Sequence, residues 1–175
     1  MPPASRLGRP AAMDDLLLFR LSRLLAIGGA PVIRLCEGRY GITRREWRVL
    51  ALLGREDNLL SSQLAQRAQL DRARTSKAIT SLVAKRLVRR EPRPGDRRQA
   101  ALTLTDEGRS LFRSLFPQVL RIHHDLLDVL DPQETALLDG MLERLQAQAD
   151  ALALSAELPK ADRRRGGARV RPVLG

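Results

Sequence analysis

Residues 71–98 of the chain read DRARTSKAITSLVAKRLVRREPRPGDRR, and this stretch decides the fold. Its first half predicts a helix from about Arg72 to Arg86, with Asp71 as the N-cap, because an aspartate side chain accepts hydrogen bonds from free amides at a helix start. Apolar residues recur there at helical spacing, so one side is expected to pack and the other to be cationic. The expected inner residues are Ala73, Ala78, Ile79, Leu82 and Val83, and the expected outer residues are Arg72, Arg74, Thr75, Lys77 and Lys85.

A shorter helix is expected immediately before this one. Ser61 or Ser62 is the expected cap, and Leu64, Ala65 and Ala68 follow as its apolar residues. Only Gln69 and Leu70 then separate it from Asp71. Two short helices joined by so few residues predict a helix-turn-helix.

The second half of the stretch predicts a β-hairpin. Residues 87–91 are followed by the turn-forming segment Pro92-Arg93-Pro94-Gly95-Asp96, and residues 98–104 end with the alternation that is typical of a strand. A hairpin directly after the second helix is the wing of a winged helix-turn-helix.

The charge of the chain is concentrated in this same stretch. The whole chain has 175 residues and a formal net charge of +11, whereas residues 71–98 alone hold ten basic and three acidic residues. Residues 99–154 hold four basic and nine acidic residues. A charge polarised in this way indicates that one face binds a polyanion.

Helices are expected on both sides of the hairpin and helix-turn-helix. Asp14 and Asp15 begin an apolar helix that Gly28, Gly29 and Pro31 are expected to kink or break. The pair Thr43 and Glu46 forms a capping box that starts another helix. After the hairpin, Thr105 caps a long helix, and Asp131-Pro132 starts a last helix whose apolar seam predicts a helical partner.

This order of elements resembles the MarR family of dimeric bacterial regulators. The resemblance covers about residues 14–154 and is carried by three short pieces of the sequence. They are Leu64-Ala65 with Leu70-Asp71-Arg72, Leu87-Val88-Arg89-Arg90, and Asp96-Arg97-Arg98 followed by Leu102-Thr103-Leu104-Thr105-Asp106-Glu107-Gly108.

The resemblance implies a mainly α fold (α+β), in which a winged helix-turn-helix with a two-stranded wing joins a helical dimerisation region. We expect a MarR-type domain over residues 13–154, with the winged helix-turn-helix at 43–104 and dimerisation helices at 14–37 and 105–154. Residues 1–12 and 155–175 lack hydrophobic periodicity and are interpreted as disordered arms, the second of them basic.

The implied function is sequence-specific binding of double-stranded DNA by a homodimer, at a pseudo-palindromic operator. In the family the second helix of the motif enters the major groove and a wing arginine enters the minor groove, which carries over to Arg98, held by Asp96. Arginine suits both places, because it can fork onto guanine and is attracted by a narrow minor groove. The predicted DNA-binding residues are Arg72, Arg74, Thr75, Ser76, Lys77, Arg89, Arg90, Arg93, Asp96, Arg97 and Arg98.

The resemblance also implies a repressor that a small aromatic acid releases from DNA. The candidate pocket residues are Arg20 or Arg23 for the carboxylate, Trp47 as an aromatic wall, and His123 or His124. Simpler roles compete with these: Trp47 as a core residue, and the arginines as partners of carboxylates at a dimer interface.

Other functions remain as alternatives. A sequence-tolerant architectural DNA-binding protein would use the same basic face. Cys36, the single cysteine, is either a redox-sensitive thiol near Arg34 and Arg39 or a buried inert one, and zinc sensing through Cys36, His123 and His124 is disfavoured by their spacing. No catalytic motif is recognised, so we expect no enzyme activity, no cofactor and no bound metal. The absence of a long apolar run predicts no membrane partner and a cytoplasmic protein. The resemblance implies a bacterial protein that is associated with the nucleoid.

Overall fold

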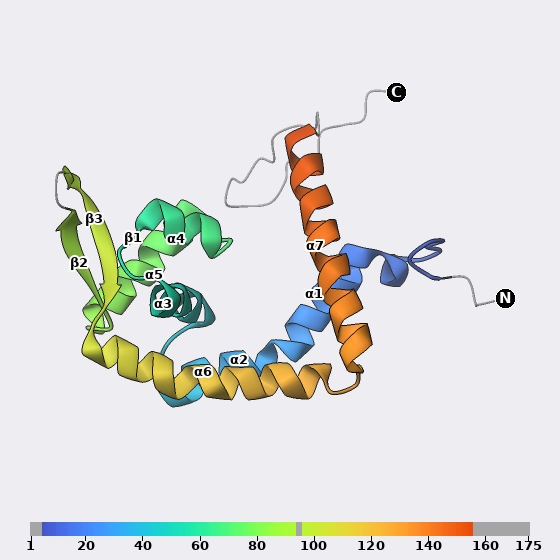
Figure 1. The fold of residues 1–175 in the computed structure, drawn as a ribbon, viewed down its shortest axis with the longest axis horizontal. Coiled ribbons are helices and arrows are strands. Elements are labelled where there is room, and N and C mark those ends of the chain that lie inside the picture. The colour runs from blue at the N-terminus through green and yellow to red at the C-terminus, as the bar shows by residue number, and fades with distance from the viewer. Residues whose placement is uncertain (1–4, 94–95, 156–175) are drawn as a thin grey trace, which may run out of the picture. The chain divides into compact units, whose positions relative to one another are not determined.

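The computed structural model describes residues 5–93 and 96–155, without the side chains of residues 93 and 96–99 (Figure 1). They form two structural units, the first up to Asp128 and the second from Val129 onward, and each is described by itself. The elements of the first unit are η1 (Met13–Asp15), α1 (Leu17–Gly28), α2 (Ala30–Tyr40), α3 (Arg44–Arg55), β1 (Leu59–Leu60), α4 (Ser61–Arg67), α5 (Arg72–Ala84), β2 (Val88–Arg93), β3 (Asp96–Leu104) and α6 (Asp106–Leu127). The second unit contains α7 (Pro132–Ser155).

The expected winged helix-turn-helix is present, with one strand more than the predicted two-stranded wing. The sheet order is β1-β3-β2, and both pairings are antiparallel. The added strand β1 is two residues long and pairs Leu59 with Leu102. The hairpin stands beside α4 and α5, and α6 passes along α3 and α2 (Figure 1).

The helix-turn-helix forms from α4 and α5 with the predicted tight connection. Gln69 adopts a positive φ of 54°, which turns the chain out of α4, and the Leu70 amide donates back to the Ala65 carbonyl. Asp71 caps α5 as predicted, since its Oδ1 accepts from the Arg74 amide at 2.7 Å.

The predicted cap of α4 is wrong. The helix begins at Ser61, so the N-cap is Leu60, which has no polar side chain to offer. The Gln63 side chain instead accepts the Leu60 amide at 2.8 Å. A free amide at a helix start can be satisfied from inside the first turn as well as from the cap, and here the inner partner is used.

The predicted interruption between the first two helices is confirmed. Helix α1 ends at Gly28 and α2 begins at Ala30. Gly29 sits between them with its amide bonded to the Leu25 carbonyl, and a Cβ at this position would lie 2.5 Å from that oxygen. A larger residue therefore cannot take this place without moving the backbone.

The predicted caps of α3, α6 and α7 are also present. Thr43 and Glu46 form the reciprocal capping box of α3. Thr105 accepts from the Gly108 amide and donates to the Arg86 carbonyl, which joins the start of α6 to the end of the α5 region. Asp131 accepts from two amides of the first turn of α7.

Helix α7, taken by itself, presents a row of exposed apolar side chains. They recur at steps of three, four and seven residues, which places them on one stripe of the helix. The exposed members of this stripe are Leu138, Met141, Leu142, Leu145 and Leu152. In the described part of the chain, no helix is both long enough and apolar enough to span a membrane.

The start of α3 is tied to the end of α5 by a buried ion pair. Glu46 is only 2% exposed, and its carboxylate accepts from the Lys85 ammonium at 2.9 and 3.0 Å. Lys85 also donates to the Gly41 carbonyl. The prediction that Lys85 belongs to the outer cationic face is therefore wrong, because this long side chain turns back to satisfy a buried charge that only the folded chain brings near it.

The hydrogen bonds around Glu46 hold its carboxyl group ionised. Burial alone raises the pKa of Glu46, but hydrogen bonds from the Ser81 side chain, the Thr43 amide and Lys85 outweigh it, and the net pKa lies below the usual value. A carboxyl pKa that is lower in the folded than in the unfolded state stabilises the fold above the unfolded pKa, and this stabilisation is lost as the pH falls through the folded value.

We therefore expect Glu46→Gln to lower the free energy of unfolding at pH 7 by about 1–3 kcal/mol, less than for a fully buried pair because Lys85 is partly exposed. The difference from the parent protein should shrink as the pH falls below about 4, near the ordinary glutamate pKa. Urea unfolding at pH 7 and at pH 3.5 measures both values. Glu56→Gln, which breaks the exposed Glu56–Arg67 pair, is the control and should cost under about 1 kcal/mol. An equal loss for Glu46→Gln at both pH values would contradict this account.

Candidate nucleic-acid interface

Helix α5 has one buried stripe and one free face. Successive side chains of an α-helix are turned by about 100°, and residues three or four apart share a face. The buried residues of α5 are Thr75, Ala78, Ile79 and Leu82. The opposite face is centred on Ala73, Lys77, Thr80 and Ala84, all of which are exposed.

Two predicted orientations on α5 are wrong. Thr75 was expected on the outer face, but it is fully buried and its hydroxyl donates to the Asp71 carbonyl at 2.9 Å. Ala73 was expected to pack inward, but it is exposed. Thr75 precedes Ile79 by one turn and so joins the inner stripe, whereas Ala73 lies six residues before Ile79 and points elsewhere.

The remaining polar side chains of α5 differ in how free they are. Lys77 and Thr80 lie at the centre of the exposed face, and Ser76 lies on its flank. Arg72 and Arg74 are exposed on the two edges, and the Arg74 Nε contacts the Asp71 carboxylate at 3.2 Å. Thr80 was missed by the sequence reasoning, although projecting the helix at 100° per residue is enough to find it.

Arg89 and Arg90 lie on opposite faces of the wing. Side chains alternate along a strand, so Arg90 shares a face with Val88 and with its cross-strand partner Leu102. This face turns toward α5, because Arg90 and Leu102 line a small hollow of about 230 Å³ together with Ser76. Arg89 lies on the other face and pairs with Glu91 at 2.6 Å. Of the two, Arg90 is the one placed beside the exposed face of α5.

The tip of the wing falls largely outside the described residues. The backbone of β3 begins at Asp96, and the register with β2 shifts between Pro92 and Arg93. The predicted DNA-contacting side chains of Arg93, Asp96, Arg97 and Arg98 lie outside the described part of the chain. That Asp96 holds Arg98 stays a prediction.

The predicted effector residues do not meet in one place within the described structure. Arg20 and Arg23 line a hollow of about 520 Å³ together with Phe19, whereas Trp47 lines another of about 780 Å³. The rings of His123 and His124 lie 5.6 Å apart and line neither of these two hollows.

The hollow beside Trp47 is aromatic at its base and basic at its rim. Trp47 stacks on Phe112 with ring centroids 6.1 Å apart, and Phe112 stacks on Phe116 at 5.2 Å. The basic lining residues are Arg48, Arg55 and Arg67. Trp47 is 7% exposed and belongs to the core, so the simpler role weighed for it from the sequence is present, together with a place on the wall of this hollow.

The single cysteine is not activated. Cys36 is fully buried, and burial, with a smaller contribution from Glu37, raises its pKa to about 11. A thiol in this state is protonated at neutral pH and reacts poorly with oxidants. Of the two interpretations of Cys36, the geometry favours the inert one. Among the residues that the structure describes, no three metal-ligating side chains gather in one place.

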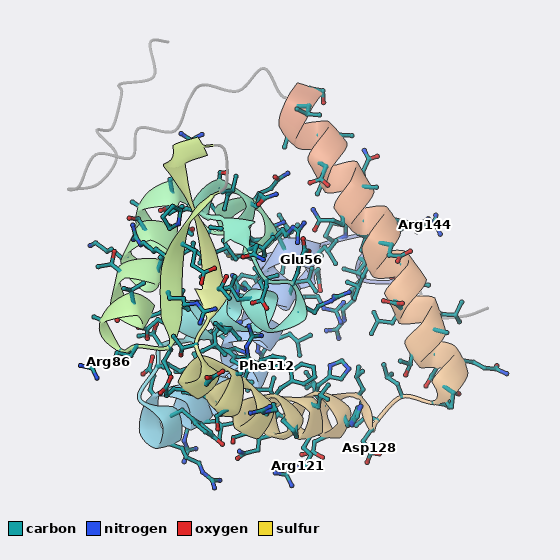
Figure 2. All side chains as sticks on the ribbon, turned by 60° about the vertical axis from the view of Figure 1, so that its left-hand side comes forward. Glu56, Arg86, Phe112, Arg121, Asp128 and Arg144 are labelled. Carbon is teal, nitrogen blue, oxygen red and sulfur yellow. The ribbon has the colours of Figure 1, made fainter. Side chains whose placement is uncertain are left out.

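A basic residue just after the end of α5 offers a useful contrast. Arg86 is exposed and extends away from the end of α5 (Figure 2). It carries the same charge as the arginines at the start of the helix, but it lies at the opposite end. A variant that removes the charge of Arg86 therefore lowers the net charge without changing the start of the helix, and it serves as a control in DNA-binding measurements.

Comparisons with known proteins agree on one family. The model of the MarR family matches residues 40–99, which span α3, α4, α5 and most of the hairpin. The transcriptional regulator FarR of Neisseria gonorrhoeae is 31% identical over 111 residues, which cover 63% of this chain and 76% of FarR.

Solved structures agree as well. A probable transcriptional regulator from Pseudomonas aeruginosa is 25% identical, with a TM-score of 0.66 over 77% of this chain and 99% of that one. BpsR of Bordetella bronchiseptica, whose DNA binding is regulated by 6-hydroxynicotinic acid, has the same fold at 22% identity, with a TM-score of 0.70 over 78% of this chain and 97% of that one. The exposed face of α5, the wing beside it and these likenesses together establish that the chain belongs to the MarR family and is a DNA-binding transcriptional regulator.

Proposed function

We propose that this regulator is a homodimeric repressor that reads a pseudo-palindromic DNA site with α5 and leaves it when a small aromatic carboxylate binds. The observation that carries the DNA-reading part is the free face of α5. One stripe of the helix is held by the core, while Lys77 and Thr80 stand exposed on the opposite side. A helix of this diameter fits the major groove, where every base pair presents a distinct pattern of donors and acceptors.

The proposed contacts divide by task. Lys77 and Thr80, with Ser76 beside them, are proposed to face base edges. Arg72 and Arg90 are proposed to contact phosphates, which position the protein without reading sequence. Arg98, held by Asp96, keeps the minor-groove role that the family resemblance implies. Arg93 and Arg97 remain proposed DNA contacts near the tip of the wing, with Arg93 at a phosphate.

The DNA-reading proposal is tested by selecting bound duplexes from a random pool. We expect one pseudo-palindromic site to emerge that binds about a thousandfold or more tightly than an unrelated duplex at physiological salt. Lys77→Ala and Thr80→Ala should each weaken binding to the selected site by roughly tenfold and binding to the unrelated duplex far less. Arg86→Gln is the matched control and should change neither. If no sequence emerges, the chain is a sequence-tolerant coating protein instead.

The dimer is proposed from the apolar surfaces of α1 and α7, each taken by itself. Leu18, Leu24 and Ile27 of α1 are more than half exposed, and so are Met141 and Leu152 of α7. Large apolar side chains exposed on these helices favour an interface. A two-fold dimer would present two copies of α5 to half-sites about 34–36 Å apart on one side of the DNA.

We expect Leu145→Glu, which places a charge in the apolar stripe of α7, to shift the protein from dimer to monomer in sedimentation velocity runs at micromolar concentration. Ala147→Glu is the matched control, because residue 147 points to the opposite side of the same helix and should leave the dimer intact. A monomeric parent protein, or equal behaviour of the two variants, would contradict the role of this stripe.

The effector site is proposed at the hollow between α3 and α6. Its stacked rings of Trp47, Phe112 and Phe116 suit an aromatic ring, and its arginines suit a carboxylate. Of these, Arg67 is already paired with Glu56 and Arg48 donates to the Ala68 carbonyl, which leaves Arg55 as the better partner. This revises the pocket that the sequence suggested, keeping Trp47 and replacing Arg20 and Arg23.

The release mechanism follows from the contacts of α3. This helix forms one wall of the hollow, and its Glu46 also forms an ion pair with Lys85 at the end of α5. A ligand that separates α3 from α6 would therefore carry α5 with it. It favours dimer geometries whose two α5 helices no longer match the half-sites, which is a shift in population toward the unbound form.

Thermal shift against aromatic carboxylates tests the site. Salicylate or 6-hydroxynicotinate at ten times its Kd should raise the Tm by about 3–6 °C, whereas benzyl alcohol should not. Arg55→Ala should abolish most of this shift, and the double variant Arg20→Ala/Arg23→Ala should keep it. The reverse pattern would place the ligand in the hollow beside α1, and no shift with any acid at millimolar concentration would refute the effector proposal.

A further inference from the structure

A second basic surface lies beside α5, on the side away from the wing. It surrounds a hollow of about 460 Å³ where the starts of α3 and α5 meet the turn after α4. Four arginines line this hollow, namely Arg44, Arg45, Arg48 and Arg74. We call these four the arginine cluster. Glu37 is the one carboxylate among the described residues that line the hollow, so the positive charge is in excess.

Three members of the arginine cluster form no ion pair with another described residue, namely Arg44, Arg45 and Arg48. Arg48 donates to the Ala68 carbonyl at 3.2 Å, and Arg74 contacts Asp71. Four guanidinium groups gathered with so little compensation repel one another unless an anion lies between them.

The lowered pKa of Arg48 is consistent with this repulsion. Burial, and then the nearby charge of Arg44, lower the pKa of Arg48 from its usual value. Both side chains are half-buried, so their charges are poorly screened by water. A phosphate in the hollow would relieve the repulsion, and it would find several donors already placed there.

The arginine cluster and the wing flank α5 on opposite sides. The exposed face of α5 is centred on Lys77, and Ser76 and Arg74 lie on opposite sides of it. At about 100° per residue, Ser76 is turned by about 100° from Lys77 in one sense around the helix axis, and Arg74 by about 60° in the other. Ser76 lines the hollow shared with Arg90 of the wing, whereas Arg74 lines the hollow of the arginine cluster.

This arrangement matches the cross-section of a DNA major groove. The groove is about 12 Å wide, so a helix that fills it has one phosphate backbone on each side. The wing side offers Arg90 to one backbone, and the other backbone would pass the arginine cluster.

We propose that the arginine cluster binds the phosphodiester backbone on the side of α5 opposite the wing. The inference rests on the proposed placement of α5 in the major groove, and it assigns a DNA contact to α3, a helix outside the helix-turn-helix itself. The contact carries no sequence information, because a phosphate is the same at every base pair. It sets the register of α5 in the groove and adds to affinity.

The test is the salt dependence of DNA binding by Arg45→Gln and by Arg44→Gln/Arg45→Gln. Fluorescence anisotropy is measured on two duplexes of equal length, the selected site and an unrelated sequence. We expect the double variant to lose roughly tenfold in affinity on both duplexes alike. The slope of log K against log salt should fall in magnitude by about 0.9 for each phosphate contact removed.

Arg86→Gln is again the control, since it removes the same charge at the far end of α5 (Figure 2). It should leave the affinity and the slope within error of the parent values, and the Tm of every variant is measured to verify folding. Arg44 is half-buried and Arg45 is exposed. If the double variant does not fold, the single variant Arg45→Gln decides the test. An unchanged slope for folded Arg45→Gln, or an equal change for Arg86→Gln, overturns the proposal.

Inorganic phosphate, added at constant ionic strength, separates DNA phosphate from a free anion. If a few millimolar phosphate raises the Tm of the parent protein and not that of Arg45→Gln, while Arg45→Gln leaves the salt slope of DNA binding unchanged, the arginine cluster is a site for a small anion and the DNA contact is refuted. Failure of the proposed function looks different. Without any preferred sequence, the loss on the unrelated duplex still reports on the arginine cluster.

Discussion

The ion pair between Glu46 and Lys85 is the interaction on which the working parts of this regulator depend. It joins the first turn of α3 to the end of α5, and the same carboxylate completes the capping box with Thr43. A buried carboxylate without its cation would cost several kcal/mol, so the two helices are held in one relative position. The orientation of the free face of α5, the location of the arginine cluster and the proposed link to the aromatic hollow all follow from that position.

The charged side chains of α5 lie on the side of the helix that the core leaves free. The core holds α5 by small and apolar side chains, and this leaves the outer face free for polar ones. Basic residues gather on both edges of that face, through Arg90 on the wing side and through Arg74 on the other. Residues 99–154 are acidic instead, so this segment adds no attraction for DNA.

Much of the fold was predictable because its signals are local. Asp71, Thr43 and Thr105 act as caps through amides only three residues away. The interruption at Gly29 needs nothing beyond the glycines and Pro31. The cap of α4 was mispredicted because serine is a common N-cap residue, whereas here the Gln63 side chain accepts from the Leu60 amide. The strand β1 was missed because two residues carry no periodicity and are defined by their partner strand alone.

The sequence predicted that the candidate site binds DNA, but it did not predict all of the residues that form the site. The sequence by itself determined that a basic helix follows a tight turn and precedes a hairpin, because caps, turns and helical spacing act over a few residues. Only the tertiary structure decided that Lys85 pairs with Glu46, that Arg20 and Trp47 line different hollows, and that Arg44 and Arg45 lie beside Arg74. These facts depend on which distant segments meet, and the packing of α3 against α5 and α6, rather than any local preference, brings those segments together.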